Sequence, residues 1–126
     1  MRYKHFKNAD VSVSALAVGT WAIGGQNYGQ VDRSDSIRAI RTMIDQGVNL
    51  VDTAPCYGNG ASEKIVGEAL RGIPRDQILI STKFGLITDV YSGEYIKHAS
   101  YKSVMREVES SLMNLETDYI DFYYVH

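Results

Sequence analysis

Short apolar runs alternate with segments of helical periodicity along most of the 126 residues of this chain. The apolar runs are typical of strands, and they lie at 16–18, 48–51, 78–80 and 119–125. Between them, apolar residues at helical spacing predict amphipathic helices that begin near residues 34, 62 and 100. Strands that alternate with such helices indicate parallel pairing with right-handed crossovers, so the expected fold class is α/β. This series either closes into a (β/α)₈ barrel or opens into a doubly wound sheet.

Two further segments complete the expected organisation. Residues 1–15 are polar and alternate around a turn at 8–10, which predicts a β-hairpin. Residues 84–99 are polar and aromatic and longer than most plain connections, which indicates a functional loop. We therefore expect one domain over 1–126, with the hairpin at 1–15 and four strands alternating with three helices at 16–126. Because four strands cannot close a barrel by themselves, the barrel interpretation makes this chain half of one.

Charge and cysteine content argue against several function classes. The chain has 13 basic and 15 acidic residues and a net charge of −2, so nothing marks a nucleic-acid partner. Its single cysteine, Cys56, excludes an internal disulfide. No N-terminal stretch resembles a signal peptide, and no apolar run approaches the roughly 20 residues that span a bilayer. We expect a cytoplasmic location, no membrane partner and no metal site, since His5 and His98 have no ligand-like neighbours.

Polar or ionisable residues stand just past each apolar run. These positions are Gly19, Thr20, Trp21, Asp52, Lys83 and His126. The carboxyl ends of parallel strands share one edge, and in a barrel they converge on one mouth, where active sites form. Tyr57 lies five residues past Asp52, close enough for its loop to fold back over that mouth. Position alone therefore gathers these residues into a candidate site.

The chemistry of four of these residues is complementary. A free tyrosine has a pKa of about 10, too high for ready proton exchange at neutral pH, and a neighbouring ammonium such as that of Lys83 lowers it. A carboxylate such as Asp52 would keep that ammonium charged and oriented, and His126 would supply a hydrogen bond to a substrate oxygen. Together with Tyr57 they would make a general acid for a carbonyl that receives a hydride. The hydride needs a cofactor, because no side chain can deliver one.

Each residue alone also has an ordinary explanation. Asp52 could cap a turn, Lys83 could be a solvated strand end, and Tyr57 is one of nine tyrosines. His126 could be a frayed terminal residue. Trp21 could belong to the core. The order and spacing of the set favour the functional interpretation.

Four motifs in this order resemble the aldo-keto reductases. They are Gly-Thr-Trp at 19–21, Asp-Thr-Ala-Pro-Cys-Tyr-Gly at 52–58 followed by Ser-Glu, Ser-Thr-Lys-Phe-Gly at 81–85, and Asp-Tyr-Ile-Asp-Phe-Tyr-Tyr-Val-His at 118–126. The resemblance covers the whole chain and is closest to the bacterial branch of inositol-operon and general-stress reductases, in which Gly-Thr-Trp-Ala-Ile-Gly-Gly also occurs. It implies the N-terminal half of a TIM barrel whose hairpin plugs the barrel bottom.

The resemblance also implies roles for individual residues. Tyr57 would donate the proton, Lys83 would lower its pKa, Asp52 would hold Lys83 and approach the nicotinamide ribose, and His126 would orient the carbonyl or help relay the proton. The cofactor would be NADPH, less often NADH, held without a Rossmann fold; the sequence has no Gly-x-Gly-x-x-Gly after its first strand. The implied cofactor contacts are Gly19, Thr20, Trp21 and Asp52. The implied substrate contacts are Trp21, Tyr57, Phe84 and His126.

The expected activity is the reduction of an aldehyde or ketone by the full-length protein, with the 126-residue chain alone inactive and prone to self-association through exposed barrel edges. The alternative is a regulatory or sensor subunit of the same fold that binds the cofactor and turns over little. The substrate and the choice between NADPH and NADH depend on parts of the family's barrel that follow the position of His126.

Overall fold

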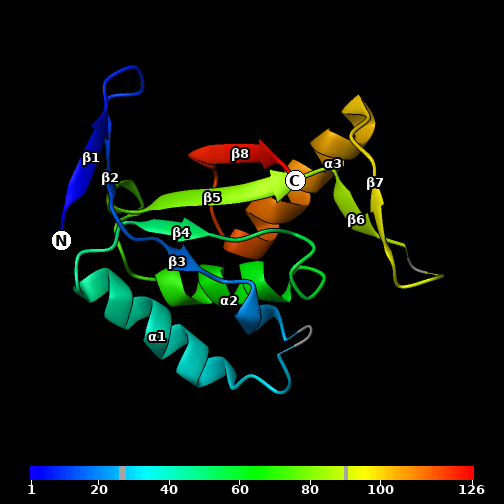
Figure 1. Cartoon of the computed structure of the whole chain (residues 1–126), viewed down its shortest axis with the longest axis horizontal. Coiled ribbons are helices and arrows are strands. Elements are labelled where there is room, and N and C mark those ends of the chain that lie inside the picture. Colours follow the sequence, from blue (N-terminus) through cyan, green and yellow to red (C-terminus); the bar gives the residue numbers. More distant parts are fainter. Residues whose placement is uncertain (26–27, 90) are drawn as a thin grey trace.

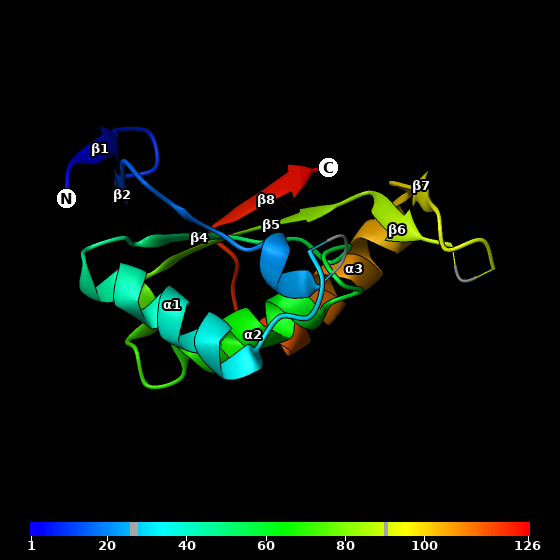
Figure 2. The ribbon, with the colours of Figure 1, turned by 60° about the horizontal axis from the view of Figure 1, so that its bottom comes forward.

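In the computed structural model of the chain, residues 1–25, 28–89 and 91–126 are described. A parallel sheet lies over a layer of helices, and its other face is open (Figures 1 and 2). The sheet contains β3 (Val18–Gly19), β4 (Leu50–Asp52), β5 (Leu79–Phe84) and β8 (Phe122–Val125) in that spatial order. The helices are α1 (Arg33–Asp45), α2 (Ala61–Leu70) and α3 (Tyr101–Leu115). The predicted parallel α/β arrangement is confirmed. Among the described residues, no helix is both long and apolar enough to cross a membrane.

Helices α1 and α3 begin where a side chain accepts a hydrogen bond from a free backbone N–H group. The Asp32 carboxylate accepts a hydrogen bond from the Asp35 backbone N–H at 2.8 Å, and the Ser100 hydroxyl accepts one from Ser103 at 3.3 Å. Gly47, with φ at +90°, lies in the left-handed region just beyond α1, where glycine carries no steric cost. These residues mark the start of α1 and α3 and the end of α1.

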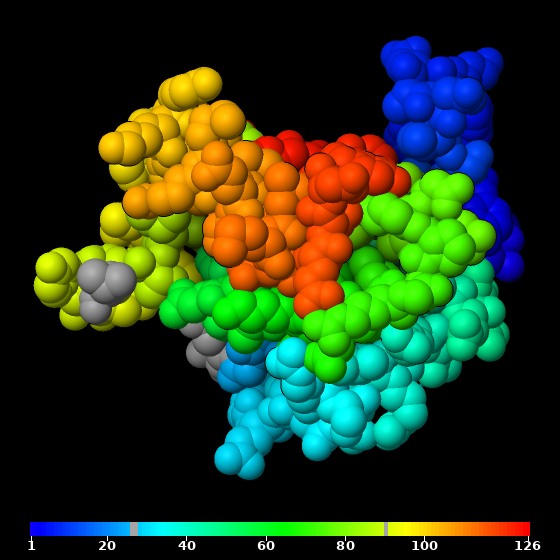
Figure 3. Space-filling model, turned by 180° about the vertical axis from the view of Figure 1, so that it is seen from behind, coloured from blue at the N-terminus to red at the C-terminus, as the bar shows by residue number. Residues whose placement is uncertain are grey.

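The core lies between the sheet and the helices. Side chains alternate along each strand, so Val51 of β4 and Ile80 of β5 point toward the helices and are fully buried. Val66 and Ala69 of α2 meet them there, also fully buried. Figure 3 shows the outer side of this layer, with α3, the segment containing α2, and α1 packed side by side. The residues between these point the other way, so Asp52, Ser81 and the cross-strand partner Gly19 lie on the open face of the sheet.

The predicted N-terminal hairpin is confirmed. β1 (Tyr3–Phe6) pairs antiparallel with β2 (Val11–Ser14), and the hairpin stands at the amino ends of the sheet strands (Figure 1). Asn49, just before β4, holds it there. Its side-chain oxygen accepts a hydrogen bond from the Ser14 backbone at 2.8 Å, and its amide donates to the Ser12 carbonyl at 2.8 Å.

The loop predicted at 84–99 contains regular structure instead. β6 (Leu86–Thr88) pairs antiparallel with β7 (Tyr95–Lys97), and this second hairpin projects from the carboxyl end of the sheet (Figures 1 and 2). Each strand has three residues, too short for a reliable alternating pattern in the sequence. Short 3₁₀ turns, η1 (Ala22–Gly24) and η2 (Arg75–Gln77), also fall within connections. The prediction of a plain loop was therefore wrong for these two strands.

Candidate active site

Asp52, Lys83 and His126 share the open face at the carboxyl edge of the sheet. Asp52 pairs in register with Ser81, and Lys83, two residues further along β5, pairs with Tyr124 of β8. The His126 backbone N–H donates to the Phe84 carbonyl at 2.8 Å, which extends the ladder by one residue. Alternation then places the three side chains on the same face. The structure thus brings together residues that are up to 74 positions apart in the chain (126 − 52).

The Lys83 ammonium is fixed by three acceptors. Its Nζ donates to both Asp52 carboxylate oxygens, at 3.0 and 2.9 Å, and to the Thr53 carbonyl at 2.8 Å. The Ser81 hydroxyl donates to Asp52 Oδ1 at 2.8 Å. The Lys83 and Asp52 side chains are 16% and 36% exposed, so this ion pair is partly desolvated. The positive charge of Lys83 is therefore held in one place near the carboxyl end of the sheet.

Tyr57 lies over that charge. The Lys83 Nζ is 5.2 Å from the centre of the Tyr57 ring, and the His126 ring meets Tyr57 edge to face at a centroid distance of 5.9 Å. The Tyr57 backbone N–H donates to the Ala54 carbonyl at 3.1 Å, which closes the turn that aims the ring. All four residues of the predicted catalytic set thus lie together.

The loop that carries Tyr57 is pinned by a close approach of two glycines. A Cβ on Gly58 would lie 2.1 Å from the Gly24 carbonyl oxygen, and Gly58 has φ at +62°. A Cβ on Gly24 would lie 2.7 Å from the Tyr57 carbonyl carbon. No other residue type fits this contact without moving the loop. Gly24, at the end of η1, and Gly58 therefore fix the position of the Tyr57 loop.

Thr20 and Trp21 occupy different environments. Thr20 is 1% exposed, and its hydroxyl donates to the Asp52 carbonyl at 2.8 Å. The Ser62 hydroxyl contacts the Thr20 hydroxyl and carbonyl oxygens at 2.8 and 2.9 Å. Trp21 is 47% exposed and lies 6.5 Å from the Tyr57 ring, between centroids. The observed contacts of the Thr20 side chain are internal, while Trp21 borders the open site.

Phe84 does not join the set. It follows Lys83 directly, so alternation turns it to the helix side of the sheet, where its ring lies 4.9 Å from that of Tyr123. Burial, together with Glu107 and Glu63, raises the pKa of Tyr123 to about 12, which makes this tyrosine a poor proton donor. The structure therefore does not support Phe84 as part of the substrate wall.

His126 has a neighbour that sequence reasoning did not assign to the site. The Cys56 Sγ lies 3.5 Å from His126 Nδ1, across 70 positions of sequence. Partial burial of the ring, together with the Lys83 charge, lowers the pKa of His126 from its ordinary value. Burial raises the pKa of the Cys56 thiol, which is 5% exposed. At neutral pH the imidazole and the thiol are therefore both uncharged.

A second group missed from the sequence supports the site from below. Glu63 is fully buried and accepts hydrogen bonds from the Thr82 hydroxyl at 2.8 Å and the Asn114 amide at 3.0 Å. It thereby ties α2 and α3 to β5 beside Lys83. Both residues lie in motifs that the sequence analysis singled out, Glu63 in Ser-Glu and Thr82 in Ser-Thr-Lys. Nothing in the sequence indicated that the two side chains would meet.

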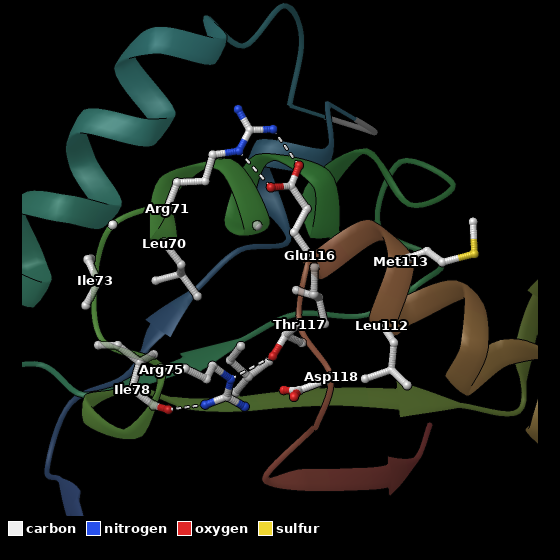
Figure 4. A pocket seen from close by; sticks show the side chains of 14 residues that line it. Leu70, Arg71, Ile73, Arg75, Ile78, Leu112, Met113, Glu116, Thr117 and Asp118 are labelled. Carbon is white, nitrogen blue, oxygen red and sulfur yellow. Dashed lines mark hydrogen bonds and ion pairs between the residues drawn. The ribbon is translucent and has the colours of Figure 1, made fainter.

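A large cavity lies elsewhere, on the helix side of the sheet. It has a volume of about 620 Å³ and is bounded by the ends of α2 and α3 and by Ile78 and Ile80 (Figure 4). The Arg71–Glu116 ion pair crosses one side of it. None of the four clustered residues lines it, so size alone does not locate the chemistry.

Comparison with known proteins agrees with this geometry. The family model described as "Aldo/keto reductase family" matches residues 15–126. The chain belongs to the aldo/keto reductase family. It is 44% identical over 127 aligned residues to the aldo-keto reductase YhdN of Bacillus subtilis, covering 100% of this chain and 38% of that protein. It is 40% identical to the NADH-specific methylglyoxal reductase of Escherichia coli, covering 93% of this chain and 39% of that one.

Solved aldo-keto reductase structures superpose on the same half-barrel. The holo form of AKR11C1 from Bacillus halodurans matches with a TM-score of 0.88 and 30% identity, covering 100% of this chain and 40% of that one. An aldo-keto reductase from Klebsiella pneumoniae in complex with NADPH matches with a TM-score of 0.76 and 34% identity, again covering 100% and 40%. The chain thus spans about two fifths of the length of these relatives and corresponds to part of a (β/α)₈ barrel.

Proposed function

We propose that this chain supplies the acid–base residues of an enzyme that reduces an aldehyde or ketone to an alcohol with NADPH, or with NADH. The observation that carries the proposal is the Lys83 ammonium, held by Asp52 at 2.9 Å and placed 5.2 Å from the Tyr57 ring centre. An ammonium fixed beside one tyrosine, at the edge where parallel strands end, is the arrangement a proton donor to a substrate oxygen requires.

The bound nicotinamide would supply the hydride. Tyr57 donates its phenolic proton to the carbonyl oxygen as negative charge develops there. The Lys83 charge stabilises the phenolate that remains, and Asp52 keeps that charge in place. Partial burial and the Lys83 charge lower the pKa of His126, which favours the uncharged ring, and its one N–H would donate a hydrogen bond to the substrate oxygen.

The open face fits the nicotinamide end of such a cofactor. Gly19 ends β3 and is exposed, and a Cβ there would meet nothing within 4 Å, so a flat ring can approach the backbone. Trp21 offers an exposed indole beside Tyr57. The Asp52 side chain keeps 36% of its surface exposed while it holds Lys83. Thr20 would contribute to the cofactor site indirectly, because its buried hydroxyl donates to the Asp52 carbonyl and fixes the backbone there. NADPH is the proposed cofactor and NADH the alternative, since one relative is named NADH-specific and another was solved with NADPH.

We also propose that residues 1–126 form the N-terminal half of one barrel domain and are inactive alone. The chain covers 38% of the length of the relative YhdN, β3 and β8 are edge strands, and Tyr124 and Val125 of β8 are 50% and 72% exposed. Unpaired strand edges associate readily. Sedimentation of the isolated residues should therefore show dimers or larger species, and a stable, well-folded monomer would contradict this part of the proposal.

The activity is tested in the full-length protein. Purified enzyme is mixed with NADPH and a panel of aldehydes and ketones, and cofactor oxidation is followed together with transfer of deuterium from labelled NADPH into the alcohol. The expected result is steady turnover with label in the product. Tight NADPH binding with negligible turnover across the panel would instead identify a cofactor-binding regulatory subunit.

A further inference from the structure

We propose that Cys56 is a positioning residue that holds the His126 imidazole with its proton on Nε2, facing the substrate oxygen. The inference rests on the proposed carbonyl reduction, and it assigns a part in it to a side chain that would not touch substrate or cofactor. It is carried by the contact between Cys56 Sγ and His126 Nδ1 at 3.5 Å.

The backbone around Cys56 aims the thiol at the ring. The Tyr57 N–H donates to the Ala54 carbonyl at 3.1 Å, and the Tyr95 hydroxyl of β7 donates to the Cys56 carbonyl at 3.3 Å. The Tyr57 ring also stands edge to face against His126, with planes at 87°. The imidazole is therefore held between a thiol on one nitrogen and a phenol ring on its side.

The direction of the hydrogen bond is assigned from the state of the two groups and from the weakness of sulfur as an acceptor. A neutral imidazole carries one N–H and one acceptor nitrogen, and a thiol can donate its proton to that acceptor. Burial keeps Cys56 protonated because it raises the pKa of the thiol, while the lowered pKa of His126 keeps the ring neutral. A neutral pair allows two directions, but sulfur is only a weak acceptor, so the assigned pairing is S–H to Nδ1. In that pairing the ring proton is on Nε2, and Nε2 becomes the donor.

The other groups that face His126 do not set this tautomer. Lys83 of β5 and Asp52 of β4 are engaged with one another at 2.9 Å. Tyr57 meets the ring edge to face, which favours an orientation but selects neither nitrogen. Among the residues that the structure describes, Cys56 contributes the side-chain atom, Sγ, that lies within hydrogen-bond distance of an imidazole nitrogen of His126. Cys56 is thus the group that chooses between the two nitrogens.

The proposal is tested by the tautomer itself. Full-length protein labelled with ¹⁵N-histidine is studied by NMR at pH 7.5, with His126 assigned by its loss in His126→Asn. The wild-type spectrum should show the Nε2–H form, and Cys56→Ala should shift the ring toward a mixture of tautomers. Cys56→Ser, which retains a hydroxyl donor, should keep the Nε2–H form.

Kinetics give a second readout. Cys56→Ala should lower kcat about two- to tenfold, the range that corresponds to the net worth of one neutral hydrogen bond. The KM for NADPH should stay unchanged, and Cys56→Ser should restore most of the rate. Ile65→Val is the control for a small loss of packing, because Ile65 is 6% exposed in the core on the helix side of the sheet. It should leave both kcat and the tautomer at wild-type values.

Two results would overturn the inference: an Nδ1–H imidazole in the wild type, or an unchanged tautomer and rate in Cys56→Ala. If Cys56→Ala fails to fold, the wild-type spectrum and Cys56→Ser decide the matter. Because the NMR measurement needs no turnover, a failure of the proposed reductase activity is distinguishable from a failure of this inference.

Discussion

Asp52→Asn removes the negative charge from the Lys83 ion pair and leaves a side chain of nearly the same size. In the wild type, Nζ donates to both carboxylate oxygens at 3.0 and 2.9 Å and to the Thr53 carbonyl at 2.8 Å. An asparagine offers one side-chain oxygen, so the ammonium loses one hydrogen bond and its counter-charge. The Ser81 hydroxyl, which donates to Oδ1, can keep its partner.

The cost in stability follows from these contacts. A hydrogen bond between charged groups contributes about 1.5–3 kcal/mol. The Asp52 side chain is 36% exposed, so solvent screens part of the electrostatic gain. We therefore expect a loss of about 1–2 kcal/mol in the free energy of unfolding. The loss in rate should be larger, roughly 100-fold or more in kcat, because positioned proton donors contribute about 10²–10⁴-fold.

Asp121→Asn is the matched control. Asp121 forms an ion pair with Arg75 at 2.6 Å, with side chains 18% and 22% exposed, and it also accepts a hydrogen bond from the Ile80 backbone at 2.8 Å. It precedes β8, at the end of the sheet away from the site. Urea unfolding and steady-state kinetics on both full-length variants give the comparison. Both should lose stability, but Asp52→Asn alone should lose turnover.

Two outcomes would refute this reasoning. Wild-type turnover in Asp52→Asn would mean that the Lys83 position does not depend on the carboxylate. Equal rate losses in the two variants would mean that Asp52 acts through stability alone.

The remaining predictions concern the pH response and the Tyr57 loop. Because the pKa of His126 in the folded protein lies below its ordinary value of 6.5, the folded state binds this proton less readily than the unfolded state. The stability that the neutral His126 ring contributes is present above pH 6.5 and is lost as the pH falls through the lowered pKa. Urea midpoints measured between pH 7.5 and 5 should fall with pH for this reason. In His126→Asn the part of this fall that is due to His126 should be missing. Identical profiles in both proteins would contradict it. Gly58→Ala should displace the loop and sharply reduce kcat, since its Cβ would meet the Gly24 carbonyl oxygen at 2.1 Å. Gly72→Ala, at φ +82° with open space around it, should carry only the backbone cost of about 1–2 kcal/mol and leave kcat unchanged; equal rate losses would rule out the clash as the cause.

Most of the parallel α/β arrangement was predictable from the sequence. Apolar runs mark the strands: Asp52 ends β4, Lys83 is the last residue but one of β5, and His126 follows β8. Placing the strands therefore also places these residues at the carboxyl end of the sheet. The N-terminal hairpin followed from alternation around a turn. Apolar spacing marked the helices, and Asp32 and Ser100 also marked the starts of α1 and α3.

What could not be predicted depends on register and on long-range contacts. Strand β5 runs on to Phe84, and only its exact alternation shows that Phe84 faces the helices while Lys83 faces the site. The Cys56–His126 contact joins residues 70 positions apart, and no local pattern encodes it. The hairpin of β6 and β7 has strands too short for periodicity to distinguish them from a loop.

Tyr57→Phe tests the proposed proton donor most directly. The substitution removes one hydroxyl and keeps the ring that meets His126 at 5.9 Å and lies 5.2 Å from the Lys83 Nζ. In the full-length protein, kcat for carbonyl reduction should fall by at least about 100-fold, while the dissociation constant for NADPH, measured by fluorescence titration, should stay at its wild-type value. Wild-type turnover in Tyr57→Phe would contradict the role assigned to this tyrosine.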